Sequence, residues 1–382
     1  MKIKVFGLFN ICSGGRPSEA AALGGPPPRD RRHFDLPDAI RLSGLTLFTL
    51  FYSLRSVNFA AYPAEDAAML LRYAAHLASG HGIVWNIGDP PVDGATDFLF
   101  LLAVAVLAKV GFTLEAAVRS LDLASHLATT ALIYLAVTRL QQAPQWMAYL
   151  SAAFFAMGPG LNYTSACFGT PFFALWAATT WYLAMSLAQE AQPGMSGAIP
   201  FASAALLLGL ARPEGVFLAV FVLVALVVLR GIRATRPVVG CFLAVFVVIG
   251  GAYFLWRWQY FGYPLPNPFY VKGGGAIYPG NLIRAAKNTL SLAGPFASIL
   301  TAAGYYLVAA LFLRPRESSI RALAFGLLPV VGFTSIWVLL SNEMNFRMRF
   351  QYASLPLVLM SWPGLLKHLL PSIRLAGYGK TR

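Results

Sequence analysis

Long apolar runs separated by short polar segments recur along most of this chain. A helix that crosses the hydrocarbon core of a membrane needs about 20 predominantly apolar residues, and several of the runs meet or approach that length. Over the whole chain 58% of the residues are hydrophobic and only 12% are charged, whereas a soluble domain carries about 25% charged residues. We therefore predict an all-α fold, a polytopic bundle of transmembrane helices.

The apolar runs predict about ten spans. They lie at residues 42–60, 98–111, 120–138, 146–161, 166–188, 201–229, 237–256, 291–313, 320–340 and 352–366. The transmembrane domain then covers 42–366, between a disordered basic tail at 1–41 and a basic C-terminal tail at 367–382. Orientation signals conflict at 98–170, where two runs are short and one of them is a candidate for a re-entrant segment.

The basic residues cluster between the apolar runs and account for a net charge of +14. Clustered Lys and Arg are typical of the cytoplasmic loops of membrane proteins, and this distribution argues against nucleic acid as a partner. We predict a multi-pass protein of the inner (plasma) membrane with both tails in the cytoplasm. Residues 61–97 and 257–290 then form the first and second extracytoplasmic loops.

An adjacent acid pair, Glu65 and Asp66, follows the first predicted span. Pro63 suits the first turn of a helix, and good helix formers at 64–79 followed by Gly80 predict an interfacial helix. Acidic residues in a first turn are stabilised by the helix dipole, so capping is one explanation of the pair. A chemical one is that a carboxylate at the outer boundary accepts a proton from an attacking hydroxyl, or that the pair holds a divalent cation such as Mg²⁺ or Mn²⁺.

Several segments in the first loop and beyond form a collinear pattern between residues 60 and 360. They are Glu65-Asp66-Ala-Ala-Met-Leu-Leu-Arg72-Tyr73 with Gly80-His81-Gly82-Ile-Val-Trp85-Asn86, Val92-Asp93-Gly94-Ala95-Thr96, Leu210-Ala-Arg212-Pro213-Glu214-Gly215, Tyr263-Pro-Leu-Pro-Asn267-Pro-Phe-Tyr270-Val-Lys272, and Arg347-Met-Arg349-Phe350-Gln-Tyr352. In this order they resemble the signatures of GT-C glycosyltransferases, polytopic enzymes that use polyprenyl-phosphate-linked sugars. The terminal arabinofuranosyltransferases and the mannosyltransferase-like membrane proteins are similar.

The resemblance implies an inverting glycosyltransferase that moves a sugar from a polyprenyl phosphate to an envelope glycan, lipid or protein acceptor on the extracytoplasmic face. It implies catalytic roles for Asp66 and Glu65, with a carboxylate as general base on the acceptor hydroxyl. The chain departs from the family pattern where Glu65 replaces an aspartate, where Ala95 replaces an aromatic residue, and where Gly169 replaces a carboxylate.

The resemblance also implies groups that bind the donor phosphate, the sugar and the acceptor. The candidates for the phosphate are Lys272, Arg347, Arg349, Arg72 and Tyr270. The candidates for the sugar or acceptor are Trp85, Asn86, Asp93, Thr96, His81 and Asn267. Alternatives stay open, because a loop lysine can meet lipid headgroups, a long arginine can snorkel, and aromatic residues at a membrane interface give the same pattern as sugar-stacking residues.

Arg212 and Glu214 lie within a predicted span, where unpaired charges are costly. We predict that they form a structural ion pair around Pro213, either with each other or between helices. No residue pattern demands a cofactor, and a cation at Glu65 and Asp66 is the one metal site to consider. Two other functions remain open for the chain. One is a transporter or flippase of lipid-linked glycans, and the other is a catalytically weakened GT-C relative with a binding role.

Overall fold

The computed structural model describes residues 36–271, 276–313, 317–340 and 345–378, and this part of the chain contains helices and no strands. The predicted all-α fold is therefore confirmed. The helices are α1 (Leu36–Ser56), α2 (Glu65–Ala78), α3 (Phe98–Lys109), α4 (Leu114–Leu135), α5 (Gln145–Ala156), α6 (Gly160–Ser165), α7 (Thr170–Leu187), α8 (Met195–Ala211), α9 (Gly215–Arg230), α10 (Ile232–Val245), α11 (Gly251–Phe261), α12 (Asn267–Val271), α13 (Pro279–Ala293), α14 (Ala297–Leu313), α15 (Glu317–Ser335) and α16 (Ser354–Tyr378).

Short segments of other helical types join or extend these helices. Ala136–Leu140 extends α4 and Phe246–Gly250 joins α10 to α11, both as π-helix, while Gly294–Phe296, Ile336–Val338 and Phe346–Met348 are 3₁₀-helical. Four continuous helices in the described ranges are long and apolar enough to cross a membrane: Leu114–Leu140, Ile232–Phe261, Pro279–Phe312 and Glu317–Val338. The chain thus has the helices of a membrane protein, and the total of ten spans stays a prediction.

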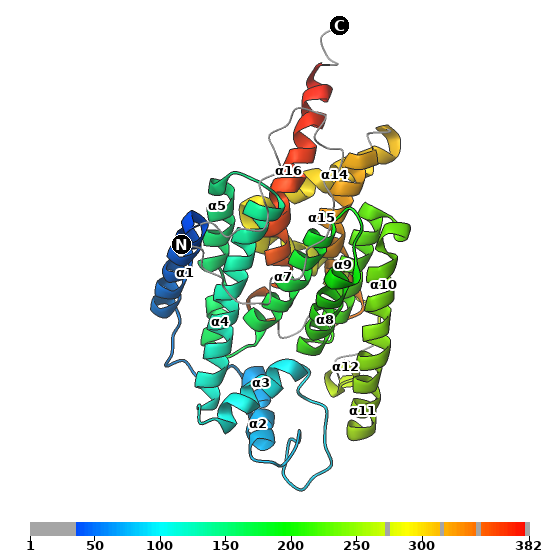
Figure 1. Cartoon of the computed structure of the whole chain (residues 1–382). Coiled ribbons are helices and arrows are strands. Elements are labelled where there is room, and N and C mark those ends of the chain that lie inside the picture. Colours follow the sequence, from blue (N-terminus) through cyan, green and yellow to red (C-terminus); the bar gives the residue numbers. More distant parts are fainter. Residues whose placement is uncertain (1–35, 272–275, 314–316, 341–344, 379–382) are drawn as a thin grey trace.

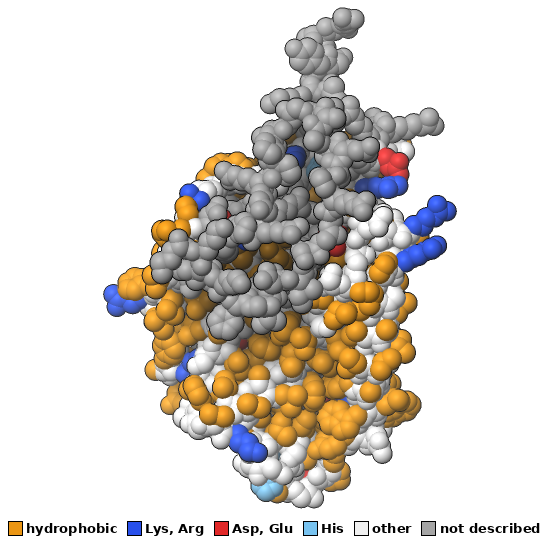
Figure 2. All heavy atoms as spheres, in the orientation of Figure 1, with side chains coloured by type: hydrophobic (Ala, Val, Ile, Leu, Met, Phe, Trp, Pro, Cys, Tyr) orange, Lys and Arg blue, Asp and Glu red, His pale blue; other side chains and the backbone are white. Residues whose placement is uncertain are grey.

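Helix α7 lies at the centre of the bundle, in contact with α4, α8, α9 and α16 (Figure 1). Its inward positions hold small residues, among them the fully buried Ala174, Ala177 and Ala178. Small side chains let helix backbones approach closely, which is how helices associate in a membrane, where lipid is as apolar as leucine. Outward faces carry large hydrophobic side chains, and these cover much of the surface in Figure 2.

The two ends of the bundle differ. Helices α2, α3 and α12 lie at one end, the lower end in Figure 1, and α16 leaves the bundle at the other. We call these the α2 end and the α16 end. The turn between α9 and α10, which follows Arg230, lies toward the α16 end (Figure 1).

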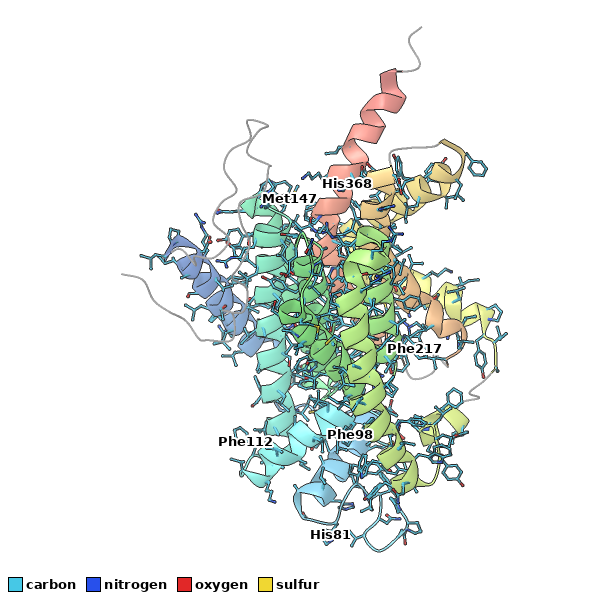
Figure 3. The ribbon with its side chains drawn as sticks, turned by 45° about the vertical axis from the view of Figure 1, so that its right-hand side comes forward. His81, Phe98, Phe112, Met147, Phe217 and His368 are labelled. Carbon is cyan, nitrogen blue, oxygen red and sulfur yellow. The ribbon has the colours of Figure 1, made fainter. Side chains whose placement is uncertain are left out.

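Two predicted spans differ from the structure. The run at 98–111 forms only the short helix α3, and Figure 3 shows Phe98 and Phe112, on either side of it, at the same level near the α2 end. Helix α3 therefore runs across the bundle and is too short to span it. The run at 201–229 is not one span but two helices, α8 and α9, which pack against each other.

The chain reverses between α8 and α9 for local reasons. Arg212 is extended (φ −155°, ψ 142°), and residues before a proline such as Pro213 disfavour the helical region. Gly215 then brings α9 so close to α8 that a Cβ at this position would collide with the Leu208 carbonyl oxygen. The apolar run therefore folds back on itself at a short, largely buried polar turn, Arg212–Glu214.

Other boundaries shift more modestly. Helix α1 begins at Leu36, inside the segment predicted as a disordered tail, and α16 continues through the predicted C-terminal tail as far as Tyr378. The predicted second loop, 257–290, contains the end of α11, all of α12 and most of α13. Apolar composition marks the hydrophobic core of a span but not where the helix stops, because helices extend beyond the hydrocarbon on both sides.

Candidate active site

Helix α2 places the two acids of the first loop in different surroundings. The predicted helix at 64–79 is confirmed as Glu65–Ala78, and it ends before Gly80, which has a positive φ of 85°. Both acids lie in its first turn. Glu65 is exposed and has no ion-pair partner in the described part of the chain, whereas the carboxylate of Asp66 forms an ion pair with Arg349.

Five charged side chains from four separate segments meet near this helix. Asp66 on α2 pairs with Arg349 from the loop before α16. Arg212, in the turn between α8 and α9, lies with Nε 2.7 Å from Glu214 Oε1 and with Nη1 3.7 Å from an oxygen of Asp97, the residue before α3. We call these five residues the acid–arginine cluster.

Both arginines of the cluster lie against aromatic rings. The guanidinium carbon of Arg349 is 4.0 Å from the ring centroid of Phe168 and 5.0 Å from that of Phe350. The guanidinium carbon of Arg212 is 5.5 Å from the same Phe350 ring and 5.7 Å from Phe173. The side chain of Arg349 is only 7% exposed, and its buried Nε has no hydrogen-bond partner among the described residues.

Burial and neighbouring charges set the protonation of the cluster. Burial raises the pKa of Asp97, opposed by Arg212 and by a 3.1 Å hydrogen bond from the Thr96 hydroxyl. Burial, and next the like charge of Arg212, lower the pKa of Arg349. Burial also acts to lower the pKa of Arg212, but Asp97 and Glu214 outweigh it and raise that pKa. The cluster thus holds two guanidinium groups close enough to affect each other.

The loop that presents Arg349 has an unusual backbone. Arg347 and Met348 both have positive φ values, 46° and 66°, a conformation that costs roughly 1–2 kcal/mol for each non-glycine residue. The Tyr163 hydroxyl donates a 2.6 Å hydrogen bond to the Arg347 carbonyl. The Asn345 side chain accepts a 3.0 Å hydrogen bond from the backbone N–H that follows Arg349. Strain of this kind persists only where surrounding contacts hold it, and it is frequent at functional sites.

A second buried ion pair, between Asp93 and Arg257, ties the first loop to α11. The backbone N–H of Asn267 donates to the Asp93 carbonyl at 3.0 Å, so the start of α12 joins this contact. Burial raises the pKa of Asp93 to about 6, although Arg257 opposes the shift. Two residues predicted to bind sugar or acceptor, Asp93 and Asn267, are thus brought together where the first loop meets α11 and α12.

Arg72 has its hydrogen bonds within the first loop. Its Nε donates to the Trp85 carbonyl at 2.7 Å, and an Nη donates to Asn86 Oδ1 at 2.8 Å. Its guanidinium carbon also lies 4.4 Å from the Trp85 ring centroid. Asn86 in turn donates to Asp89 at 2.9 Å. Arg72, which was predicted to bind phosphate, therefore holds Trp85 and Asn86 in position, two residues that were predicted to bind sugar or acceptor.

The remaining candidates lie at the periphery. His81 is exposed at the tip of the first loop (Figure 3). Tyr270 is 47% exposed, against Tyr263 and Phe269. Arg347 is exposed, with its guanidinium over its neighbouring phenylalanine. Lys272 lies outside the described residues.

Sequence reasoning missed two members of these ion pairs, Asp97 and Arg257. A signal existed for each of them. Asp97 directly precedes the apolar run of α3, the position where aspartate commonly begins a helix. Arg257 interrupts an aromatic and apolar run between Trp256 and Trp258, and an isolated charge in such a run indicates a buried partner.

The only metal site that the sequence suggested was the acid pair. In the described ranges, no group of three or more His, Cys, Asp or Glu side chains is placed to hold a metal ion. Asp66 is engaged with Arg349 instead. The charges that Asp66 and Asp97 face in the cluster are guanidinium groups of the chain itself.

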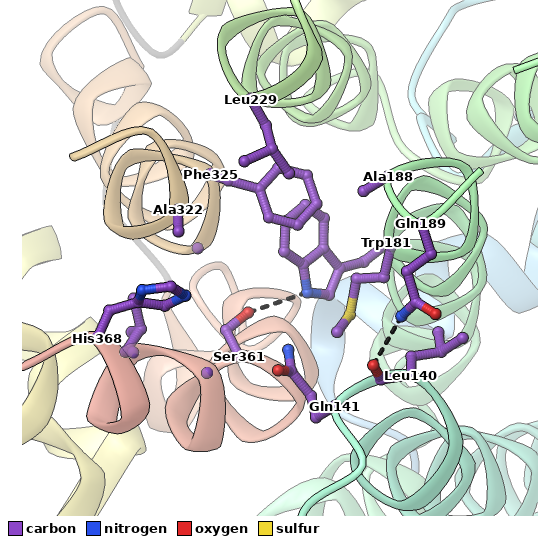
Figure 4. A pocket seen from close by; sticks show the side chains of 14 residues that line it. Leu140, Gln141, Trp181, Ala188, Gln189, Leu229, Ala322, Phe325, Ser361 and His368 are labelled. Atoms are coloured by element: carbon purple, nitrogen blue, oxygen red, sulfur yellow. Dashed lines mark hydrogen bonds between the residues drawn. The ribbon is translucent and has the colours of Figure 1, made fainter. Parts of the chain in front are cut away.

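A separate cavity of about 240 Å³ lies near the α16 end, where Figure 3 places His368. Figure 4 shows Trp181 donating a hydrogen bond to the Ser361 hydroxyl, 3.0 Å, on one side of this cavity, with Gln141 facing it. The lining is aromatic, aliphatic and uncharged polar apart from His368. It therefore differs in chemistry from the acid–arginine cluster at the opposite end.

Comparison with known protein families, with characterised proteins and with solved structures finds no match to this chain.

Proposed function

We propose that this chain is an inverting membrane glycosyltransferase of the GT-C type, with its active site at the acid–arginine cluster on the extracytoplasmic side. One observation supports this most. Three segments that carry the sequence resemblance, far apart along the chain, supply Asp66, the Arg212–Glu214 turn and Arg349, and these residues meet in one cluster. Residues with unrelated local roles have no reason to converge in this way.

The donor would be a sugar on a polyprenyl phosphate, because the cluster offers buried guanidinium groups beside a bundle that faces lipid. Arg349 would donate charge-assisted hydrogen bonds to the phosphate. Its place between Phe168 and Phe350 keeps water from the guanidinium and fixes its plane. The polyprenyl chain would remain in the membrane beside the apolar helices.

Asp66 is the better placed of the two acids to act as general base. Its side chain is 30% exposed, so it can meet an acceptor from the aqueous side. It would take the proton from the acceptor hydroxyl as that oxygen bonds to the anomeric carbon. The bond from that carbon to the phosphate oxygen breaks, with inversion, and the polyprenyl phosphate leaves with its negative charge beside Arg349.

Glu65, one residue away, lacks such a setting, because it is exposed and contacts no arginine in the described ranges. The leading acid of the pair therefore contributes less than the second. The replacement of Asp by Glu at position 65 then affects an acid whose exact position matters less for the reaction.

The test is transfer by purified protein in lipid nanodiscs, with labelled polyprenyl-phosphate sugars and a panel of glycan and lipid acceptors. We expect Asp66→Asn to lower the rate by about 10²–10⁴-fold, the usual contribution of a general base, and Glu65→Gln to have a much smaller effect. Asp89→Asn, at an exposed acid that accepts a hydrogen bond from Asn86, controls for the loss of one negative charge in the same loop.

Undiminished transfer by Asp66→Asn would remove the base assignment. Movement of a lipid-linked sugar across vesicles without a new glycosidic bond would identify a flippase instead. Binding of the donor without turnover by the unaltered protein, for every acceptor offered, would identify a weakened relative with a binding role.

A further inference from the structure

We propose that Arg349, supported by Arg212, forms an anion-binding site whose internal occupant is the Asp66 carboxylate, and that a phosphate-bearing lipid displaces Asp66 from it. Displacement would free the carboxylate at the moment the donor is in place. The role of the freed carboxylate as a general base rests on the proposed function. The anion-binding site itself can be tested by binding measurements alone.

Arg349 has more hydrogen-bonding capacity than Asp66 uses. A guanidinium group carries five N–H donors in a fixed planar fork, and one Nη of Arg349 contacts Asp66. Its Nε is buried and lacks an acceptor among the described residues, and a buried donor without an acceptor is unfavourable. A ligand with several acceptor oxygens would satisfy both edges of the fork.

Arg212 adds a second cation to the same place. It shares the Phe350 ring with Arg349, and after burial its like charge is the next cause that lowers the pKa of Arg349. Asp97 and Glu214 hold Arg212 in position. The two like charges repel each other, and an anion bound to Arg349 reduces that repulsion.

Asp66 is suited to be the occupant that leaves. It lies in the first turn of α2, and its side chain is partly exposed whereas that of Arg349 is buried. The carboxylate can therefore turn toward water while the guanidinium stays.

The proposal predicts opposite effects of Asp66→Asn on phosphate binding and on sugar transfer. If the Asp66 carboxylate competes with phosphate for Arg349, the substitution must increase the affinity for phosphate and abolish transfer. If Asp66 only holds the loop in place, its removal must weaken binding or leave it unchanged. The sign of the effect on binding therefore decides between a competitor and a structural partner.

The experiment measures the affinity of farnesyl phosphate for the whole protein in phosphatidylcholine nanodiscs by titration calorimetry. We expect Asp66→Asn to bind it about tenfold more tightly, because a neutral amide competes for the guanidinium less strongly than a carboxylate does. Glu65→Gln removes the same charge one residue away, and we expect its affinity to change by less than about twofold, since Coulomb interactions of exposed charges are screened.

Two further arms identify the chemistry recognised. Farnesol, which lacks the phosphate, and inorganic phosphate, which lacks the lipid chain, separate the two parts of the ligand. We expect weak binding of inorganic phosphate that also tightens in Asp66→Asn, and no Asp66-dependent change for farnesol. Arg349→Gln should lose the binding of both phosphate probes, and Arg349→Lys should restore part of it.

Unchanged or weaker binding by Asp66→Asn would overturn the proposal, as would farnesyl phosphate binding that survives in Arg349→Gln. Thermal unfolding of each variant shows whether it is folded, and Arg349→Lys still decides the question if Arg349→Gln does not fold. Tighter binding by Asp66→Asn together with absence of transfer by the unaltered protein would keep the anion site and reject the glycosyltransferase.

Discussion

Arg349 connects the loop before α16 to helix α2 through its ion pair with Asp66. At the scale of single residues, this arrangement occurs three times. A largely buried arginine from a distant segment pairs with an aspartate between the start of α2 and the start of α3: Arg349 with Asp66, Arg257 with Asp93 and Arg212 with Asp97. Breaking a buried pair by removing one partner costs about 3–5 kcal/mol. Each of these pairs therefore holds a loop segment near the site in position, and also determines where the charges of the site lie.

Asp93 offers a test of this at the residue scale. Its folded-state pKa of about 6 lies above the ordinary value of 3.8, so the folded protein holds the proton to higher pH than the unfolded chain. The stability that this proton contributes is present below about pH 4 and is lost as the pH rises through 6. We expect this loss to reach about 3 kcal/mol, since one pKa unit is 1.36 kcal/mol.

The measurement is the unfolding midpoint in detergent between pH 4 and 7, for the protein and for Asp93→Asn. The variant cannot ionise at this position, so the difference between the two curves should change with pH, with the variant gaining relative to the wild-type protein at higher pH. Parallel curves across the range would contradict the assigned shift.

Sequence reasoning identified Asp66, Arg212, Glu214 and Arg349 by motif, but not which charge meets which. A pairing of Arg212 with Glu214 was predicted as one alternative, and that contact is present. The contact of Arg212 with Asp97 and that of Asp66 with Arg349 depend on how distant helices pack, which no local pattern encodes.

At the scale of elements, periodicity and glycine signals were sufficient for α2, whose ends depend on local chemistry. They were insufficient for α3 and for the α8–α9 pair. A long apolar run has the hydrophobicity of one span whether its helix continues or reverses. Within the run, only the sequence Arg-Pro-Glu-Gly indicated the reversal. The charges there were explained as an ion pair around Pro213, and the run was still counted as one span.

The loop before α16 provides the test at this scale. Arg347 has a positive φ of 46°, which glycine adopts without steric cost. We expect Arg347→Gly to be more stable than Arg347→Ala by about 1 kcal/mol, because both remove the same side chain and only the alanine retains the strain. Thermal unfolding of the two variants measures the difference, and a more stable alanine variant would show that this backbone is unstrained.

At the scale of the whole molecule, the α2 end holds the first loop, the α8–α9 turn and the residues before α16, and the turn between α9 and α10 lies toward the other end. Composition predicted a helical bundle with apolar helices, and the described ranges contain four helices long and apolar enough to cross a membrane, because hydrophobicity summed over the chain is a property of the whole. It left the number of spans and their direction as predictions, because both depend on which short runs cross.

Cysteine labelling from either side of the membrane tests this arrangement, in a background without native cysteines. The contact of Arg212 with Asp97 places the α8–α9 turn at the α2 end. We therefore expect Pro213→Cys and His81→Cys to react with an impermeant reagent added to the same side of the membrane. The cysteine of Arg233→Cys should react only with reagent added to the opposite side. Labelling of positions 213 and 233 from one side would reject the reversal between α8 and α9.

The contact between Asp66 and Arg349 also has a consequence for how the protein is made. The two residues lie near opposite ends of the sequence, so the chain emerges from the ribosome with its acid long before the arginine that will meet it. The same holds for the α8–α9 turn, which is synthesised between them. A nascent or truncated chain can thus insert the helices before Arg349 and still lack a complete cluster, because the ion pair with Asp66 can form only after Arg349 has been synthesised.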